Sequence, residues 1–251
     1  MINVIKADFK KMYYLSSYLH YVLAIGLLSI LFGFTFLFTI GVTQGKELTQ
    51  LAGLEVMDIT LLGMDIAAIM LIIFAASFIS NEFTSGSICP SLAITPLRHR
   101  YYFSKMIFIA VLSLLVSITL TVIFFGLSNL VLSVNNMKTV PIFQQALLLK
   151  FIGALFLPLF YSVLSAAAAF YFQSASGGTT FALGVMFLPA FIKMFPAGVS
   201  DVLLTVLPER SLHTLSEAGA AGQWLSAASI LLGWIVISSF MGLSKLKRTD
   251  F

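Results

Sequence analysis

The chain has 251 residues, of which 59% are hydrophobic and only 10% charged, and its mean hydropathy is +1.03. Soluble domains contain roughly 25% charged residues, so this composition excludes an ordinary soluble domain and predicts a polytopic membrane protein in contact with the lipid bilayer. The net charge of +4 is too small to indicate a nucleic-acid partner, and we expect none. A single cysteine, Cys89, excludes an internal disulfide.

Residues 1–21 form the first predicted element, an amphipathic helix. Its apolar residues recur at helical spacing on one face and its polar residues fall elsewhere: Ile2, Ile5, Phe9, Met12 and Tyr13 against Asn3, Asp8, Lys10 and Lys11. A helix of this kind lies in the headgroup plane with its apolar stripe in the lipid. The alternative is a basic flank that only orients the first span.

Six apolar segments follow, at 22–42, 59–80, 106–134, 148–172, 179–195 and 224–243. A helix needs roughly 20 apolar residues to cross the hydrocarbon core, whereas a membrane barrel would show short alternating segments. The fold class is therefore predicted to be all-α, with six transmembrane helices in a single transmembrane domain covering residues 1–251.

Lysine and arginine set the predicted orientation, because they are enriched in cytoplasmic segments. With the N-terminus inside, nine of the 14 basic residues are cytoplasmic: Lys6, Lys10, Lys11, Arg98, Arg100, Lys105, Lys245, Lys247 and Arg248. The outer side then holds five: Lys46, Lys138, Lys150, Lys193 and Arg210. We expect a multi-pass protein of the plasma membrane with both termini and the 81–105 loop in the cytoplasm.

The outer connections differ in character. Residues 43–58 are predicted to form a polar hairpin. Residues 196–223 are moderately apolar and are interrupted by Pro196 and Pro208. The latter segment is too short to cross the membrane twice, so we predict a broken outer hairpin of two short helices that enter the outer leaflet. A plain surface loop is the alternative.

Motifs for catalysis or nucleotide binding do not occur in the sequence. The one Gly-Lys pair, Gly45-Lys46, lacks the spacing of a phosphate-binding loop. The three histidines have no second ligand at helical spacing, and there is no nucleophile elbow. We therefore expect neither an enzyme nor a metal or cofactor site. Among the charged residues in the spans, Asp65 either lines a substrate pathway or is a paired or wet carboxylate near the outer interface, and Lys193 is expected to snorkel outward.

The loop at 81–105 is the main polar interruption between two spans. Glu82 follows the second span, residues 85–87 break the helix, and Ile88–Ile94 is predicted to form a short helix along the membrane surface. Thr95 and Pro96 are predicted to restart a helix as its N-cap and first residue. The basic residues Arg98, Arg100 and Lys105 are then expected to anchor that helix to anionic headgroups.

This loop resembles the corresponding segment of the permease subunits of ABC-2 type ABC transporters. Glu82-Phe83-Thr84-Ser85-Gly86-Ser87-Ile88, followed by Thr95-Pro96-Leu97-Arg98, is similar to the family pattern E-F-x-x-G-[ST]-I…P-[IVL]-x-R. The six spans, the amphipathic N-terminal helix and the broken outer hairpin also resemble the family. Cys89-Pro90 and Ser91 depart from the family pattern.

The resemblance implies a type V exporter-like architecture in which the loop forms a coupling helix that docks on a separate ATP-binding subunit. The implied coupling residues are Glu82, Phe83, Ser85, Gly86, Ser87, Ile88, Leu92, Arg98 and Arg100. ATP and magnesium would be bound by that partner, and a second permease copy or a paralogue would complete the substrate pathway. The expected function is export of an amphipathic or antimicrobial peptide or a hydrophobic drug. An ion-gradient-driven secondary transporter and a non-transporting immunity protein are the alternatives.

Overall fold

A computed structural model describes residues 2–44, 50–94, 97–217 and 221–249. Every regular element in these ranges is a helix. They are α1 (Ile2–Tyr14), α2 (Ser16–Gln44), α3 (Gly53–Leu61), α4 (Gly63–Thr84), α5 (Ile88–Ile94), α6 (Arg98–Val134), α7 (Gln145–Phe172), α8 (Ala175–Ile192), α9 (Ala197–Val206), α10 (Pro208–Ser216) and α11 (Ala221–Arg248).

Six helical segments are long and apolar enough to cross a membrane, which confirms the predicted all-α class and the number of candidate spans within the described ranges. They are Ser16–Ile40, Gly53–Thr84, Arg98–Val134, Gln145–Phe172, Ala175–Ile192 and Gly222–Arg248. Most extend beyond the predicted limits. The 37 residues of α6 reach about 55 Å at 1.5 Å per residue, well beyond a hydrocarbon core of about 30 Å. Its polar first two turns carry Arg98, Arg100 and Lys105 in helical conformation, as the predicted helix restart before the third span requires.

The N-terminal region differs from the single helix predicted for residues 1–21. α1 ends at Tyr14, and α2 begins at Ser16 after a break at Leu15. Phe9 and Met12 pack against the bundle core, whereas the prediction placed them in the lipid, and Asp8 also faces the bundle and is only 4% exposed. The prediction that Asp8 lies on the polar face is therefore wrong, because a partner inside the bundle compensates its burial.

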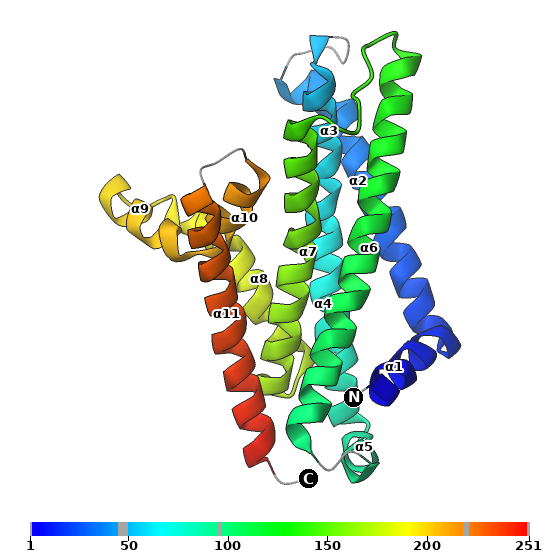
Figure 1. Cartoon of the computed structure of the whole chain (residues 1–251), viewed down its shortest axis with the longest axis vertical. Helices are drawn as coiled ribbons and strands as arrows, with labels where there is room; N and C mark the ends of the chain where they lie inside the picture. Colours follow the sequence, from blue (N-terminus) through cyan, green and yellow to red (C-terminus); the bar gives the residue numbers. More distant parts are fainter. Residues whose placement is uncertain (1, 45–49, 95–96, 218–220, 250–251) are drawn as a thin grey trace.

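The helix α7 lies at the centre of the bundle, with α4, α6, α8 and α11 around it (Figure 1). Its Ala166–Ala169 run is buried and lets neighbouring helices approach closely: a Cβ on Gly242 of α11 would lie 2.7 Å from the Ala167 carbonyl oxygen. The Ser165 hydroxyl donates to the Ile72 carbonyl of α4 at 2.8 Å. These contacts agree with the interpretation of the small residues of α7 as packing positions.

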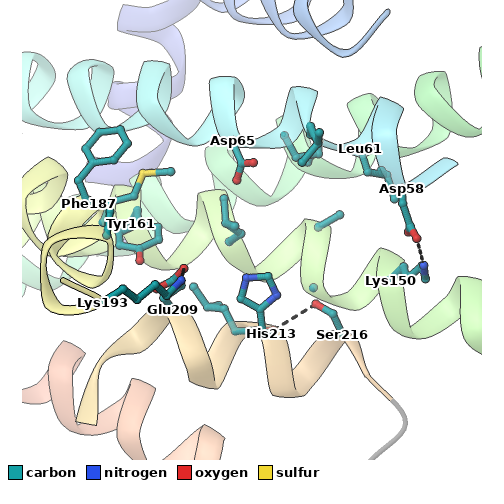
Figure 2. Close-up of a pocket in the computed structure, with 18 residues that line it drawn as sticks. Asp58, Leu61, Asp65, Lys150, Tyr161, Phe187, Lys193, Glu209, His213 and Ser216 are labelled. Atoms are coloured by element: carbon teal, nitrogen blue, oxygen red, sulfur yellow. Dashed lines mark hydrogen bonds and ion pairs between the residues drawn. The ribbon is translucent and has the colours of Figure 1, made fainter. Parts of the chain in front are cut away.

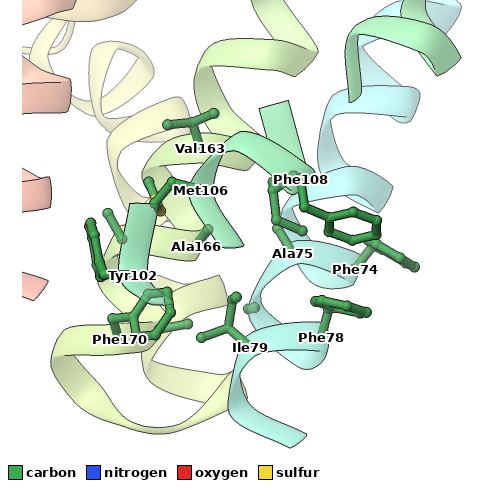
Figure 3. Close-up of a cluster of buried hydrophobic side chains, with 14 of the residues drawn as sticks. Phe74, Ala75, Phe78, Ile79, Tyr102, Met106, Phe108, Val163, Ala166 and Phe170 are labelled. Atoms are coloured by element: carbon green, nitrogen blue, oxygen red, sulfur yellow. The ribbon is translucent and has the colours of Figure 1, made fainter. Parts of the chain in front are cut away.

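The two ends of the bundle carry different elements (Figure 1). α1, α5 and the last turn of α11 lie at one end, here called the α5 end, and α3 lies at the other, the α3 end. An aromatic cluster fills the core near the α5 end (Figure 3): Phe78 stacks on Phe108 with ring centroids 4.8 Å apart, and Tyr102 contacts Phe170 at 4.7 Å. This core holds α4, α6 and α7 together beside α5.

The segment after α8 contains two short helices, α9 and α10, as the interrupted apolar pattern predicts. α10 begins with Pro208 at its first position and packs on α7 and α11 through the buried Leu212. The indole Nε1 of Trp234 in α11 donates to the Val206 carbonyl at 3.0 Å. The predicted polar hairpin at 43–58 is different: its second part belongs to α3, and residues 45–49 lie outside the described ranges.

Candidate functional site

The turn between α4 and α5 is built by a left-handed glycine. α4 ends at Thr84, and Gly86 has a φ of 67°, a conformation that glycine adopts without the steric cost of a Cβ. The Ser85 hydroxyl donates to the Asn81 carbonyl at 2.6 Å, and a second hydrogen bond of 2.9 Å joins it to the Ser87 hydroxyl. The chain therefore leaves α4 through a compact turn, and the predicted short helix follows as α5.

The short helix α5 packs on the bundle with one face, and its other face is exposed. Ile88 is 2% exposed and belongs to the aromatic core, and Leu92, one turn later, packs partly against it. Cys89 and Pro90 are exposed, as are Ser85 and Gly86 in the preceding turn. The alternation follows from the helical period, since positions i and i+4 share a face. We call the exposed group Ser85, Gly86, Cys89 and Pro90 the α5 surface.

Four charged side chains from three helices meet directly behind this turn. The Lys105 ammonium of α6 lies 2.5 Å from an Asp8 oxygen of α1 and 2.5 Å from an oxygen of Glu82 in α4. Lys11 of α1 lies 3.4 Å from the same Glu82 oxygen, and the Tyr101 hydroxyl donates to the other. With two carboxylates and two ammonium groups, this ion cluster has no net charge.

Burial makes the ion cluster energetically important. The side chains of Asp8, Glu82 and Lys105 are 5%, 6% and 3% exposed, whereas Lys11 is 32% exposed. Lys105 also lies over the Phe78 ring, 5.3 Å from its centroid. Burial raises the pKa of Asp8, while the neighbouring Lys105 opposes that rise. Loss of one partner from such a buried pair typically costs about 3–5 kcal/mol, because the remaining charge stays out of water.

Two basic residues have roles other than the expected headgroup contacts. Lys105 is buried in the ion cluster. Arg98 donates from one guanidinium nitrogen to the carbonyl oxygens of Leu246, Lys247 and Thr249, at 3.0, 2.9 and 2.7 Å. The first two carbonyls lie in the last turn of α11 and the third directly follows it, where backbone acceptors lack helical partners. Only Arg100 of the three is exposed, as a headgroup contact requires.

The predicted restart at Thr95 and Pro96 falls outside the described ranges. The described part of α6 begins at Arg98 with Leu97 as its N-cap. The other predicted coupling residues divide by exposure: Phe83, Ser87 and Leu92 are partly buried, while Glu82 and Ile88 are buried. Phe83 packs edge-on against Phe170 at 6.0 Å. The turn and the short helix are thus packed against the bundle through their buried side chains.

The ion cluster was not predicted as a unit, although the sequence contains a partial signal for it. Tyr101 and Lys105 are four residues apart and share a face of α6, next to the apolar positions Met106 and Phe108. Asp8 lies three residues after Ile5 and four before Met12, within the apolar stripe of α1. Two opposite charges, each on an apolar stripe, indicate a buried pair, but their 97-residue separation gives no local hint that they meet.

Asp65 lines a cavity of about 430 Å³ towards the α3 end, bounded by α3, α4, α7, α8 and α10 (Figure 2). Two ion pairs lie in its wall: Lys150 with Asp58, and Lys193 with Glu209 at 3.4 Å. Lys193 is 59% exposed, and its expected snorkelling towards the outer interface stays a prediction. The His213 ring of α10 lies across the cavity from Asp65, a neighbour that the sequence alone did not indicate.

Comparison with known proteins adds no assignment. A scan of protein-family models finds no match to the chain, and no curated protein is significantly similar to it. Within the described ranges, no three His, Cys, Asp or Glu side chains are grouped as a metal ion would require.

Proposed function

We propose that this protein is the permease subunit of an ABC exporter, driven by a separate ATP-binding subunit that docks on the α5 surface. The observation that carries the proposal is α5 itself: a seven-residue helix between two long spans, exposed on one side and fastened on the other. In this arrangement, a partner bound to the exposed side of α5 can displace the helix. The nine inner basic residues favour a cytoplasmic location for it.

Force applied to α5 would reach the bundle through its rigid attachments. Ile88 couples the helix to the aromatic core, and the turn at Gly86 joins it to the end of α4. One turn behind, Glu82 is held by Lys105 of α6 and Lys11 of α1. A displacement of α5 would therefore move α1, α4 and α6 together, in the manner of a rigid-body switch. Glu82 and Ile88 act here as positioning residues, and the exposed residues make the contact.

The remaining parts of the proposal concern the assembly and its cargo. ATP and magnesium would be bound by the partner subunit. A second copy or a paralogue would cover part of the apolar surface on α2 and α11, where Leu27 and Phe240 are 71% and 73% exposed, and lipid would cover the rest. The cargo would be an amphipathic or antimicrobial peptide or a hydrophobic drug, moved out across the plasma membrane.

Co-purification tests the proposal. The tagged protein is co-expressed with an ATP-binding subunit encoded beside its gene, extracted in mild detergent and analysed for the subunit and for ATPase activity. Cys89→Arg places a bulky charge on the α5 surface and should abolish association without lowering the thermal stability of the permease alone. Ser17→Arg, a change at another exposed position at the start of α2, should leave association intact. Failure of the wild-type protein to retain any ATP-binding subunit would refute the proposal.

A further inference from the structure

The cavity beside Asp65 contains one carboxylate without a counter-charge in contact. Asp58 is paired with Lys150 and Glu209 with Lys193, so these four groups balance one another in the wall. Asp65 lies in the first turn of α4 and points into the space (Figure 2). It makes neither a hydrogen bond nor an ion pair with any residue in the described ranges. His213 and Glu209 act on it only electrostatically, across the cavity.

The rest of the wall is largely apolar. Leu61, Met64, Leu157, Met186 and Phe187 line it, and Tyr161 contributes a ring. A volume of about 430 Å³ lies in the range of pockets that hold small organic molecules, roughly 300–1,000 Å³. Such pockets typically combine an apolar wall with few polar groups that fix orientation. In this cavity, Asp65 is the polar group placed to fix the orientation of a ligand.

We propose that this cavity is a binding site for a hydrophobic organic amine in its cationic form. The ammonium group would donate to the Asp65 carboxylate and supply the missing counter-charge. The apolar body would lie against Met186 and Phe187, and the Tyr161 ring face offers a further contact for a cation. A charged carboxylate in partly apolar surroundings is costly without a partner, and an ammonium ligand removes that cost.

Other ligand classes fit the same wall less well. An anion would be repelled by Asp65, and a neutral molecule would leave the carboxylate uncompensated. Asp58 and Glu209 are engaged by lysines, and the remaining Asp65 and His213 give fewer ligands than protein metal sites use. The binding site goes beyond the proposed function and does not need an ATP-binding partner; only its interpretation as a cargo site rests on that function.

Binding to the purified protein alone separates the two ideas. The full chain is reconstituted in lipid nanodiscs and titrated with radiolabelled 4-phenylbutylammonium, with empty nanodiscs subtracted. Its neutral and anionic counterparts, 4-phenylbutanol and 4-phenylbutyrate, are titrated in parallel. We expect the cation to bind more tightly than the alcohol, and the anion to bind most weakly. Asp65→Asn should weaken the cation on the order of tenfold to hundredfold, the range of one charge-assisted hydrogen bond, and leave the alcohol unchanged.

The alcohol controls for folding, because its retained binding shows that the cavity of the variant is intact. Asp201→Asn is the matched control: Asp201 is an exposed carboxylate on α9 that does not line the cavity, so binding of the cation should not change. Equal binding of cation and alcohol by the wild type, or undiminished cation binding by Asp65→Asn, would overturn the inference. Neither outcome depends on ATPase association, so the proposed function stands or falls separately.

Discussion

Replacing Lys105 by methionine should destabilise the protein strongly. Methionine keeps most of the length and the apolar stem but removes the positive charge that contacts Asp8 and Glu82, each at 2.5 Å. Glu82 keeps Lys11 and Tyr101 as partners. Asp8 keeps no hydrogen-bond partner, because its Oδ2 atom has none among the described residues and its Oδ1 atom loses Lys105.

The expected loss is about 3–5 kcal/mol, the cost of leaving a buried charge unpaired. For a chain of this size, 1 kcal/mol corresponds to roughly 2–4 °C in the unfolding midpoint, so the midpoint should fall by roughly 6–20 °C. Thermal unfolding in detergent, followed by the fluorescence of Trp224 and Trp234, measures it. Lys193→Met is the matched control, since the Lys193–Glu209 pair is exposed and such pairs contribute about 0–1 kcal/mol.

A double variant tests whether charge balance is the cause. Asp8→Asn combined with Lys105→Met removes one charge of each sign and leaves Glu82 paired with Lys11. The double variant should be more stable than Lys105→Met alone, which is the non-additivity expected of residues in contact. If Lys105→Met shifts the midpoint no more than Lys193→Met, or if Asp8→Asn gives no recovery, the ion cluster does not hold α1 to the bundle.

Three further predictions concern separate contacts. Burial raises the pKa of Asp8 above its usual 3.8, so the contribution of Asp8 to stability is full below about pH 3.8 and is lost as pH rises through the higher folded pKa. The difference in unfolding midpoint between wild type and Asp8→Asn should therefore shrink from pH 4 to pH 7. A difference that grows over this range would contradict the prediction. Arg98→Met should speed amide hydrogen exchange over residues 246–249, whereas Arg100→Met, at an exposed position, should not. Gly33→Ala should lower the unfolding midpoint by several degrees because its Cβ would lie 2.5 Å from the Thr60 carbonyl oxygen, while Gly26→Ala in the same helix meets nothing within 4 Å and should be neutral or stabilising.

The sequence predicts the features of this fold that depend on local patterns. Apolar runs identify the six candidate spans, because a helix in lipid satisfies its backbone N–H and C=O groups by hydrogen bonds within the helix. The short helix α5 follows from the break around Gly86, and the two helices after α8 follow from Pro196 and Pro208. The break at Leu15 was missed, since no glycine or proline marks it.

Long-range partners account for the remaining differences. Lys105 was expected at the headgroups because a basic residue near the end of a span usually contacts them, yet Asp8 and Glu82 make its burial possible. Arg98 likewise donates hydrogen bonds to carbonyl oxygens at the end of α11, some 150 residues away along the chain. Asp65 was recognised as a candidate from its place in a span. Its cavity was not, because that depends on α10 folding over α7 and bringing His213 opposite.

Site-specific crosslinking from α5 tests the proposed function most directly. Cys89 is the single cysteine of the chain and is exposed on α5, so a benzophenone maleimide can be attached without any mutation. After irradiation in native membranes from cells that co-express the ATP-binding subunit, we predict a crosslinked product that contains that subunit. The Cys89→Ser, Val202→Cys variant, which moves the probe to an exposed position on α9, should not give it. Absence of the subunit from the Cys89 product, or equal yield from position 202, would contradict docking at α5.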